Sequence, residues 1–320
     1  MEELNQYGKR TSHYGKDTIP LSDILVGCGQ ITWIRFMSSG AEWLAPEEQV
    51  LSEISQAGYD GAPAGPERDR SAQETIELYA RYGLRPAPGY IGTAFWNKQR
   101  RDEILERVRQ HASFARALGS TELYVAPGGF DYVTRSGQPR NKLAGHVRPE
   151  DSLTDEEFQI FAETLNLVGA ITLAEGVRSC FHNHVGTVIE TREEIDRLLL
   201  LTEPDLVFLG PDTGHLAWAG ADPVAFCRDY AKRLKTLHLK DIAADVRDRG
   251  RDAGWDYNTF SQQGIFVELG EGCVSFPAIF AILRAVDFSG WLIVETDVTQ
   301  KPTARESVTI SRAYLRTLGL

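Results

Sequence analysis

The sequence predicts an α/β fold consisting of a single (β/α)8 barrel, and three observations lead to this prediction. Short apolar runs of strand-like composition alternate with amphipathic helical stretches along almost the entire chain. The alternation gives eight strand–helix pairs in order, and 320 residues are enough for one large barrel. The alternative, an open doubly wound sheet, is disfavoured because the first apolar run ends in GCGQIT, which lacks the GxGxxG dinucleotide fingerprint.

The eight predicted strands are short and apolar, and each is bounded by Gly, Pro or a polar residue. In chain order they cover 24–29, 59–64, 84–90, 122–127, 178–184, 206–211, 236–240 and 291–295. The predicted helices cover 47–57, 70–82, 100–118, 155–175, 192–202, 223–233, 276–286 and 303–317. Capping boxes at Thr154 and Thr191, and Asp222 followed by Pro223, predict the starts of three of these helices.

The predicted barrel domain spans residues 21–320, and a polar arm of residues 1–20 precedes it. Two connections, over 128–151 and 242–267, are too long for simple βα loops and predict lids, binding loops or assembly surfaces. The second contains the charged run DVRDRGRD, which we interpret as solvated surface. Trp255 and Tyr257 beside it are better candidates for a substrate lid or a subunit contact.

Composition excludes several classes of protein. The net charge of -11 argues against a nucleic-acid surface, which needs a basic patch. We expect no membrane association and a cytoplasmic location, because the chain has neither an apolar signal-peptide core at its N-terminus nor an apolar run long enough to span a membrane. Its four cysteines are far apart and form no CxxC motif, so we expect reduced thiols.

Four of the predicted strands end in motifs that carry His, Asp or Glu. They are FHNHVGTVIET, GPDTGHL, LHLKD and LIVETD, at the ends of strands five to eight. In a (β/α)8 barrel the catalytic groups lie at the carboxyl ends of the strands, so these four endings would meet. A mixed carboxylate and imidazole site suits a divalent metal of the Mn or Zn type, with positions left open for substrate.

Three residues are the clearest candidate ligands. Asp212 follows an apolar strand; its alternative role as a helix N-cap is weakened because Asp222 already caps the helix that follows. His238 points into the barrel if the leucines of LHLKD point outward, and a hydrogen-bonded core histidine is the alternative. Glu295 could bind metal or remove a proton from carbon, unless it only pairs with Lys240 or an arginine.

Strand five leaves an alternative open. His182 and His184 are two residues apart and therefore share one face of the strand. Glu190 could fold back as the first metal ligand, or His182 could be that ligand and Glu190 a bystander. His215 is a further candidate for a catalytic or substrate-binding group, with a structural role as the alternative.

At these motifs the chain resembles the xylose-isomerase-like barrel superfamily of sugar isomerases, epimerases and related enzymes. The resemblance extends from about residue 25 to the C-terminus. It is closest to the inosose dehydratase branch, in HNHVGTVIET, PDTGHLAWAGADP, LHLKD and GWLIVETD. The α-subunits of C-glycoside deglycosidases, which pair with a small β-subunit, are similar too.

The resemblance implies a divalent metal, most often Mn²⁺ with Co²⁺, Mg²⁺ or Zn²⁺ as alternatives, held by Glu190, Asp212, His238 and Glu295. In many isomerases of the superfamily the first ligand is a glutamate on strand five, where this chain has His182. This difference disfavours an epimerase, which uses two facing carboxylates as bases. It favours a lyase that uses an imidazole.

The implied reaction is a metal-dependent β-elimination on a keto-sugar or keto-cyclitol. His184 or Glu295 would remove the proton beside the keto group, and His182 or His215 would assist departure of the leaving group. Inosose dehydratase and C-glycoside deglycosidase, the latter acting on 3-keto-C-glucosides, stay open as two versions. The polar arm and the long loops favour a hetero-oligomer with a small β-subunit. The alternatives are a ketose 3-epimerase or aldose–ketose isomerase, and a non-catalytic scaffold subunit.

Overall fold

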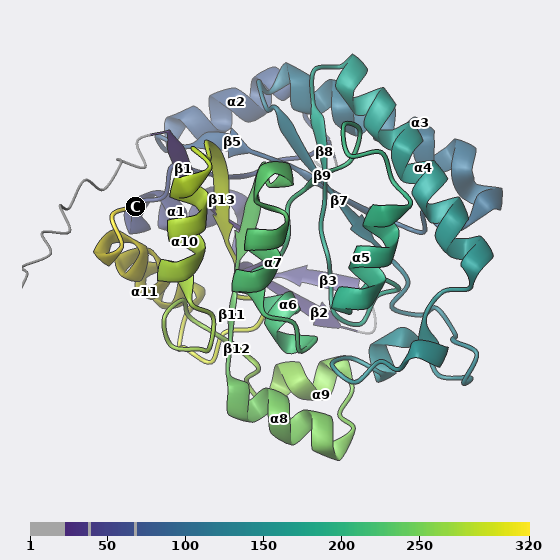
Figure 1. Cartoon of the computed structure of the whole chain (residues 1–320). Coiled ribbons are helices and arrows are strands. Elements are labelled where there is room, and N and C mark those ends of the chain that lie inside the picture. Colours follow the sequence, from purple (N-terminus) through teal and green to yellow (C-terminus); the bar gives the residue numbers. More distant parts are fainter. Residues whose placement is uncertain (1–22, 38–39, 67–68) are drawn as a thin grey trace, which may run out of the picture.

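The computed structural model describes residues 23–37, 40–66 and 69–320, so the predicted arm of residues 1–20 lies outside the described residues. Within them the predicted barrel is confirmed: parallel strands form a central ring, and helices surround it (Figure 1). The first five strands in ring order are β10 (Leu237–Leu239), β13 (Gly290–Val294), β1 (Ile24–Cys28), β4 (Gly61–Pro63) and β5 (Arg85–Ala87). The other four are β6 (Tyr90–Thr93), β7 (Glu122–Pro127), β8 (Arg178–Phe181) and β9 (Phe208–Leu209).

Two junctions close these strands into a ring. The predicted third strand, 84–90, covers β5 but only the first residue of β6, and the two strands are separated by Pro88 and Gly89. A Cβ atom at Gly89 would lie 2.4 Å from the carbonyl oxygen of Ala64, so only glycine fits this interruption. On the opposite side, parallel bridges join Leu209 to Leu234 and Asp212 to His238, and they connect β9 to β10.

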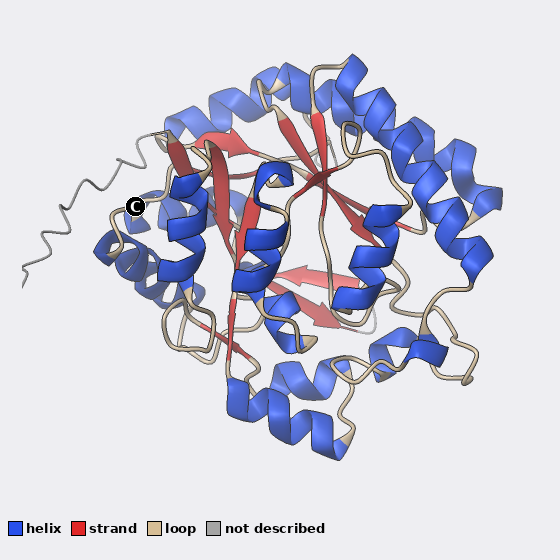
Figure 2. Ribbon diagram, viewed as in Figure 1, coloured by secondary structure: helices blue, strands red, loops and turns tan. Residues whose placement is uncertain are grey.

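A helix that packs outside the ring belongs to each of the eight strand–helix pairs, as Figure 2 shows. These helices are α1 (Glu47–Ala57), α2 (Ala72–Arg81), α3 (Arg101–Ala117), α4 (Asp155–Ala174), α5 (Arg192–Leu200), α7 (Pro223–Asp229), α10 (Phe276–Ala285) and α11 (Ala304–Thr317). The capping boxes at Thr154 and Thr191 are confirmed, and the Asp222 carboxylate accepts a hydrogen bond from the Val224 amide. Short 3₁₀ turns occupy Gln30–Trp33, Lys98–Arg100, Arg140–Lys142, Pro149–Asp151 and Ala231–Arg233.

Several elements that the sequence did not predict follow the carboxyl ends of barrel strands. β2 (Ile34–Met37) and β3 (Gly40–Trp43) form an antiparallel hairpin after β1. A short helix, α6 (Thr213–Trp218), follows β9. The long connection after β10 contains α8 (Ala244–Ala253) and α9 (Tyr257–Gln262), bracketed by the antiparallel pair β11 (Asp241–Ile242) and β12 (Phe266–Val267). These additions surround the end of the barrel that carries the four motifs.

The other long connection, residues 128–151, is anchored by a buried ion pair. Two nitrogens of Arg140 donate to the two carboxylate oxygens of Glu194 at 2.8 and 3.0 Å, and both side chains are buried. Glu194 also accepts from the hydroxyl of Ser152 and from the amide of Thr191, the N-cap of α5. A bidentate arginine–carboxylate pair fixes geometry as well as charge, so this connection is tied to the start of α5.

All four cysteines are free thiols; three of them, Cys28, Cys180 and Cys227, are buried and Cys273 is exposed. Among the described helices, none combines the length and the apolar character that crossing a membrane requires.

Candidate metal centre and active site

Asp212 is fixed by the backbone at the junction of β9 and α6. Its Oδ1 atom accepts a hydrogen bond from the His215 amide at 2.9 Å, so Asp212 is the N-cap of α6. The sequence-based argument against a capping role was therefore wrong, because a short helix lies between Asp212 and the helix that Asp222 caps. The Oδ2 atom remains free of this bond, and it lies 3.9 Å from His238 Nδ1.

His182, Asp212 and His238 form the first of two groups of potential metal ligands. One ligand atom from each lies within 4.8 Å of the others, and all three side chains are buried. His182 Nδ1 is 3.1 Å from the carbonyl oxygen of Gly210. Because a carbonyl oxygen only accepts, the proton of a neutral His182 is on Nδ1, and Nε2 has a free lone pair. Metal-binding histidines are commonly oriented by such a bond.

The chemistry of this first group fits a divalent ion. The Nε2 atom of His238 is buried and makes no hydrogen bond within the described part of the chain. Buried polar atoms normally have partners, so this nitrogen points to a ligand that would satisfy it. Asp212 Oδ2, which lies 3.0 Å from Lys240 Nζ, offers a buried carboxylate oxygen to the same ligand. Glu295 Oε2 lies 3.1 Å from His238 Nδ1 and adds a second carboxylate. A Cβ atom at Gly29 would lie 2.5 Å from Glu295 Cγ, so glycine makes room for this side chain.

Glu190 lies apart from this group. Its carboxylate accepts hydrogen bonds from the amides of Gly145 and Gly186 at 2.8 and 2.6 Å. Burial raises the pKa of Glu190 to about 7, against the opposing effect of the Arg140 charge and the two amides. Of the two possible first ligands on strand five, the structure brings His182 to the centre and places Glu190 on the backbone of two loops.

Lys240 and Asp297 complete the charges around the centre. Lys240 Nζ lies 2.7 Å from Asp297 Oδ1, 3.0 Å from Asp212 Oδ2 and 3.4 Å from Glu295 Oε2, and its side chain is buried. Burial acts to lower the pKa of Lys240, but the three carboxylates outweigh it and hold that pKa well above its usual value. Asp297 was not among the residues predicted from the sequence. Its position two residues after Glu295, on the same face of an extended chain, was the available signal.

His184, His215 and Asp297 form the second group of potential ligands, with one atom from each within 4.8 Å of the others. His184 Nδ1 lies 2.8 Å from the Val185 carbonyl oxygen, so the proton of neutral His184 is on Nδ1 and Nε2 is basic. Lys240 donates to Nε2 of His215 at 3.2 Å, so His215 has its proton on Nδ1. Burial lowers the pKa of His184 to about 4 and that of His215 well below its usual value. Both imidazoles are therefore neutral near pH 7.

Aromatic side chains from the two long connections lie next to His184. Phe130 contacts the His184 ring edge-on at 5.3 Å between centroids, and Tyr257 of α9 stacks on it at 5.9 Å. The Tyr257 hydroxyl also donates to Asp297 Oδ2 at 3.3 Å. Trp255, the other candidate for a lid, packs on Phe260 instead. Tyr257 thus covers the second group, and Trp255 belongs to the packing of α9.

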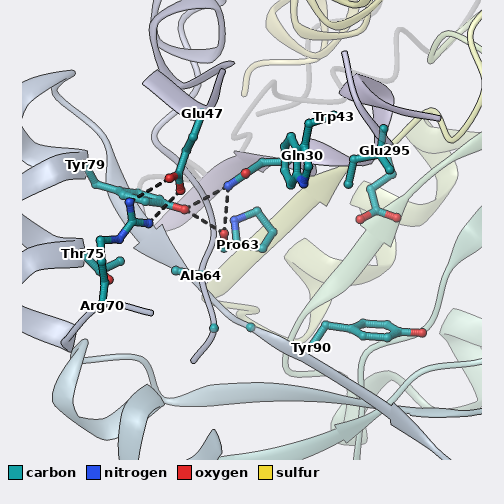
Figure 3. A pocket seen from close by; sticks show the side chains of 13 residues that line it. Gln30, Trp43, Glu47, Pro63, Ala64, Arg70, Thr75, Tyr79, Tyr90 and Glu295 are labelled. Carbon is teal, nitrogen blue, oxygen red and sulfur yellow. Dashed lines mark hydrogen bonds and ion pairs between the residues drawn. The ribbon is translucent and has the colours of Figure 1, made fainter. Parts of the chain in front are cut away.

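A pocket of about 330 Å³ leads to the centre between β1, β4 and β6. Glu295 and Tyr90 line one end, and the ion-paired Arg70 and Glu47 line the other, with Trp43 of the hairpin in between (Figure 3). A volume of this order is typical of small-molecule sites. The pocket gives a polar substrate a path to Glu295 along an aromatic wall.

The comparison with protein families agrees with this architecture. A family model described as "Xylose isomerase-like TIM barrel" matches residues 51–317. The chain belongs to this family. Among curated proteins, the chain is 33% identical over 288 residues to an inosose dehydratase of Geobacillus kaustophilus, covering 90% of this chain and 91% of the relative. It is 32% identical over 292 residues to the rhizopine catabolism protein MocC of Rhizobium meliloti, covering 91% and 86%.

Solved structures of the xylose isomerase-like type share the fold with this chain. The probable 3-DHS dehydratase AsbF of Bacillus anthracis superposes with a TM-score of 0.66 at 15% identity, covering 91% of this chain and 98% of that one. The 3-keto-D-glucoside 4-epimerase YcjR of E. coli gives a TM-score of 0.63 at 17% identity, covering 92% and 99%. At these identities the likeness concerns the barrel alone, and the chemistry has to be argued from the site.

Proposed function

We propose that this chain is a metal-dependent lyase that eliminates water from a keto-cyclitol, that is, an inosose dehydratase. The similarity to inosose dehydratases over nine-tenths of the chain supports the substrate class. The observation that carries the reaction class is the pair of neutral imidazoles, His184 and His215, whose ring centroids are 3.8 Å apart beside the first ligand group. A β-elimination needs a base and an acid close to one activated ketone.

His182, Asp212, His238 and Glu295 would hold the metal, which we propose to be Mn²⁺, with Co²⁺, Mg²⁺ and Zn²⁺ as the ions to compare. Two imidazoles and two carboxylates are a donor set that suits ions of this type. A divalent ion there supplies a Lewis acid for the ketone oxygen of the substrate. Glu190, which the family resemblance named as a ligand, is assigned a structural role in this proposal because two backbone amides already engage its carboxylate.

His184 is the base in this proposal. Its Nε2 lone pair is available because Nδ1 donates to the Val185 carbonyl, and this bond also fixes the ring. Nε2 takes the proton from the carbon next to the ketone, and the electron pair of that C–H bond forms the new carbon–carbon double bond. The aromatic cover of Phe130 and Tyr257 limits access of water to the base during this step.

His215 is the acid. Its Nδ1–H has no hydrogen-bond partner within the described residues, so this proton is free to pass to a departing oxygen. The C–O bond at the β-carbon breaks, and the hydroxide leaves as water with the proton of Nδ1. The Lys240 ammonium, which donates to Nε2 of the same ring, stabilises the negative charge that the ring gains when Nδ1 gives up its proton. Solvent returns a proton to the ring after the product leaves.

A second candidate function is the C-glycoside deglycosidase, and the pocket favours it. The pocket continues from Glu295 past Tyr90 to Trp43 and Arg70, which leaves room for a substituent beyond the reacting ring. In this version an aromatic carbon leaves in place of hydroxide, and a small partner subunit belongs to the active complex. The epimerase alternative has weaker support, because the strand-five position that carries a glutamate ligand in many isomerases of the superfamily is His182 here.

A product assay of the metal-loaded protein tests these versions, alone and with any small protein encoded beside it. We expect 2-keto-myo-inositol to yield a dehydrated diketone. Release of a phenol from a 3-keto C-glucoside would instead establish the deglycosidase. Exchange of solvent deuterium into recovered substrate without elimination would favour the epimerase. A protein that is folded but binds no metal would support the scaffold alternative.

A further inference from the structure

Lys240 lies between the two groups of potential metal ligands. Its side chain is 2% exposed, and its ammonium lies within 3.4 Å of the carboxylates of Asp212, Glu295 and Asp297. Asp212 and Glu295 belong to the proposed metal centre, whereas Asp297 belongs to the second group. The lysine therefore touches both halves of the site.

The ammonium contacts the ligand atoms that a second metal ion would use. Nζ is 2.7 Å from Asp297 Oδ1 and 3.2 Å from His215 Nε2, and both residues belong to the second group. A divalent ion bound by these atoms and His184 would lie next to the ammonium, at a distance where like charges repel strongly in a buried site. The lysine cation and a second metal ion are thus alternatives for the same space.

Packing holds the lysine side chain in this position. A Cβ atom at Gly214 would lie 2.6 Å from Lys240 Cγ, so the stem passes directly over the glycine in α6. The ring of Phe266 lies 5.5 Å from Nζ. A lysine with a packed stem and three carboxylates around its head keeps its ammonium in place, because leaving would expose each of these charges without a partner.

We infer that Lys240 is a built-in cation that keeps the centre mononuclear and reserves His184 and His215 for proton transfer. The inference rests on the metal centre of the proposed function and adds the role of Lys240 to it. The chain carries donors for two metal ions. The Lys240 ammonium takes the place of the second ion as the positive charge, and it leaves the lone pair of His184 unused. This lone pair is the one that the proposed elimination needs.

The test is metal stoichiometry, measured by titration calorimetry and elemental analysis with excess Mn²⁺. We expect one ion per chain in the unaltered protein and two in Lys240→Met, a neutral variant of similar length. Lys240→Gln, also neutral, is the second variant and gives the same result. Adding Asp297→Asn to Lys240→Met removes one ligand of the second group and should restore a single ion. Circular dichroism checks that each variant is folded.

Paramagnetic resonance of bound Mn²⁺ gives an independent readout, because two neighbouring ions couple magnetically and an isolated ion does not. An isolated-ion spectrum in the unaltered protein and a coupled spectrum in the neutral variants would support the inference. A single ion in both folded neutral variants overturns the role of Lys240 and leaves the metal centre intact. Two ions in the unaltered protein overturn it as well. Failure of the unaltered protein to bind any ion overturns the metal centre itself, and the role of Lys240 with it.

Discussion

The two carboxylate oxygens of Asp212 have separate roles. Oδ1 accepts the His215 amide and starts α6, whereas Oδ2 faces the first ligand group. Starting α6 at this point also places His215 one turn into the helix, within 4.0 Å of Asp212 Oδ2. A single side chain thus positions the proposed acid and contributes to the proposed metal centre.

The first prediction separates these two roles with Asp212→Asn. Asparagine retains an oxygen for the His215 amide but loses the charge and the second oxygen. We expect metal affinity to fall more than about 100-fold, since even supporting groups around a metal contribute 10–100-fold. Turnover should fall with it, while α6 and the melting temperature of the metal-free protein change little. Calorimetric titration with Mn²⁺ measures the affinity.

Asp222→Asn is the matched control, because Asp222 caps the next helix and lies outside both ligand groups. Asparagine is as good an N-cap as aspartate, so neither stability nor metal binding should change. Retention of full metal affinity in Asp212→Asn would remove Asp212 from the centre.

The second prediction concerns the base. His184→Gln should retain the metal, because His184 belongs to the second group, and should lower kcat by roughly 10²–10⁴ as for loss of a general base. Single-turnover measurements with substrate deuterated at the carbon beside the ketone report the proton-transfer step. His146→Gln is the control, since His146 Nε2 is hydrogen-bonded to the Trp255 carbonyl and the residue lies outside both groups. Near-normal turnover in His184→Gln would place the base elsewhere, with Glu295 as the next candidate.

At the scale of elements, the site depends on connections that are held in place by buried charges. Arg140 lies in the 128–151 connection, Glu194 lies in α5, and their bidentate contact is fully enclosed. Gly145 of the same connection donates to Glu190, so the loop is tied to the end of strand five at two points. These contacts place Phe130 against His184.

The third prediction is that Arg140→Met destabilises the protein by roughly 3–5 kcal/mol, because Glu194 is left buried without its partner. Urea unfolding measures the free energy. Arg100→Met is the control: its pair with Glu103 is also close, but both side chains are about half exposed, and such pairs contribute about 0–1 kcal/mol. Replacing both Arg140 and Glu194 by Met should recover part of the loss, and an undiminished loss would point to packing as the cause.

The sequence predicted the eight barrel strands and the helix after each because periodic apolar patterns determine them. It did not predict α6, since six residues contain too few turns for a periodic signal and GPDTGHL resembles a loop. It missed the β2–β3 hairpin because the residues of β3 are all exposed and both strands are too short for a clear apolar alternation. The helices α8 and α9 are stabilised by contacts such as Trp255 on Phe260, which no local pattern reveals.

The sequence likewise predicted some residues of the candidate site and left others unresolved. Asp212, His238 and Glu295 were found because each follows a strand that local sequence defines. The choice between His182 and Glu190 depended on how the chain folds back after Gly186, and only the three-dimensional path resolves where each side chain lies. The burial of Lys240 among three carboxylates likewise depends on contacts across three segments of the chain.

At the scale of the whole molecule, the proposed ligands come from β8, β9, β10 and β13, or from the residues that follow them. A metal that joins these segments binds the folded barrel and not the unfolded chain.

The fourth prediction is that Mn²⁺ at 100 times its Kd raises the free energy of unfolding by about 2.7 kcal/mol, and that a chelator reverses this gain. Thermal unfolding with and without EDTA checks it. The Asp212→Asn variant should show no such difference, and an equal response in that variant would locate the stabilising ion elsewhere.

The junction between β9 and β10 has a consequence for how the ring and the site are related. β9 is only two residues long, and beyond it Asp212 and His238 pair directly as backbone neighbours, with the His238 amide donating to the Pro211 carbonyl. Closure of the ring and the distance between these two proposed ligands therefore change together. Any motion that separates β9 from β10 also separates the Asp212 carboxylate from the His238 imidazole. Hydrogen exchange at the His238 amide should consequently report both the closure of the ring and the binding of the metal. We expect this exchange to become slower when the ion binds.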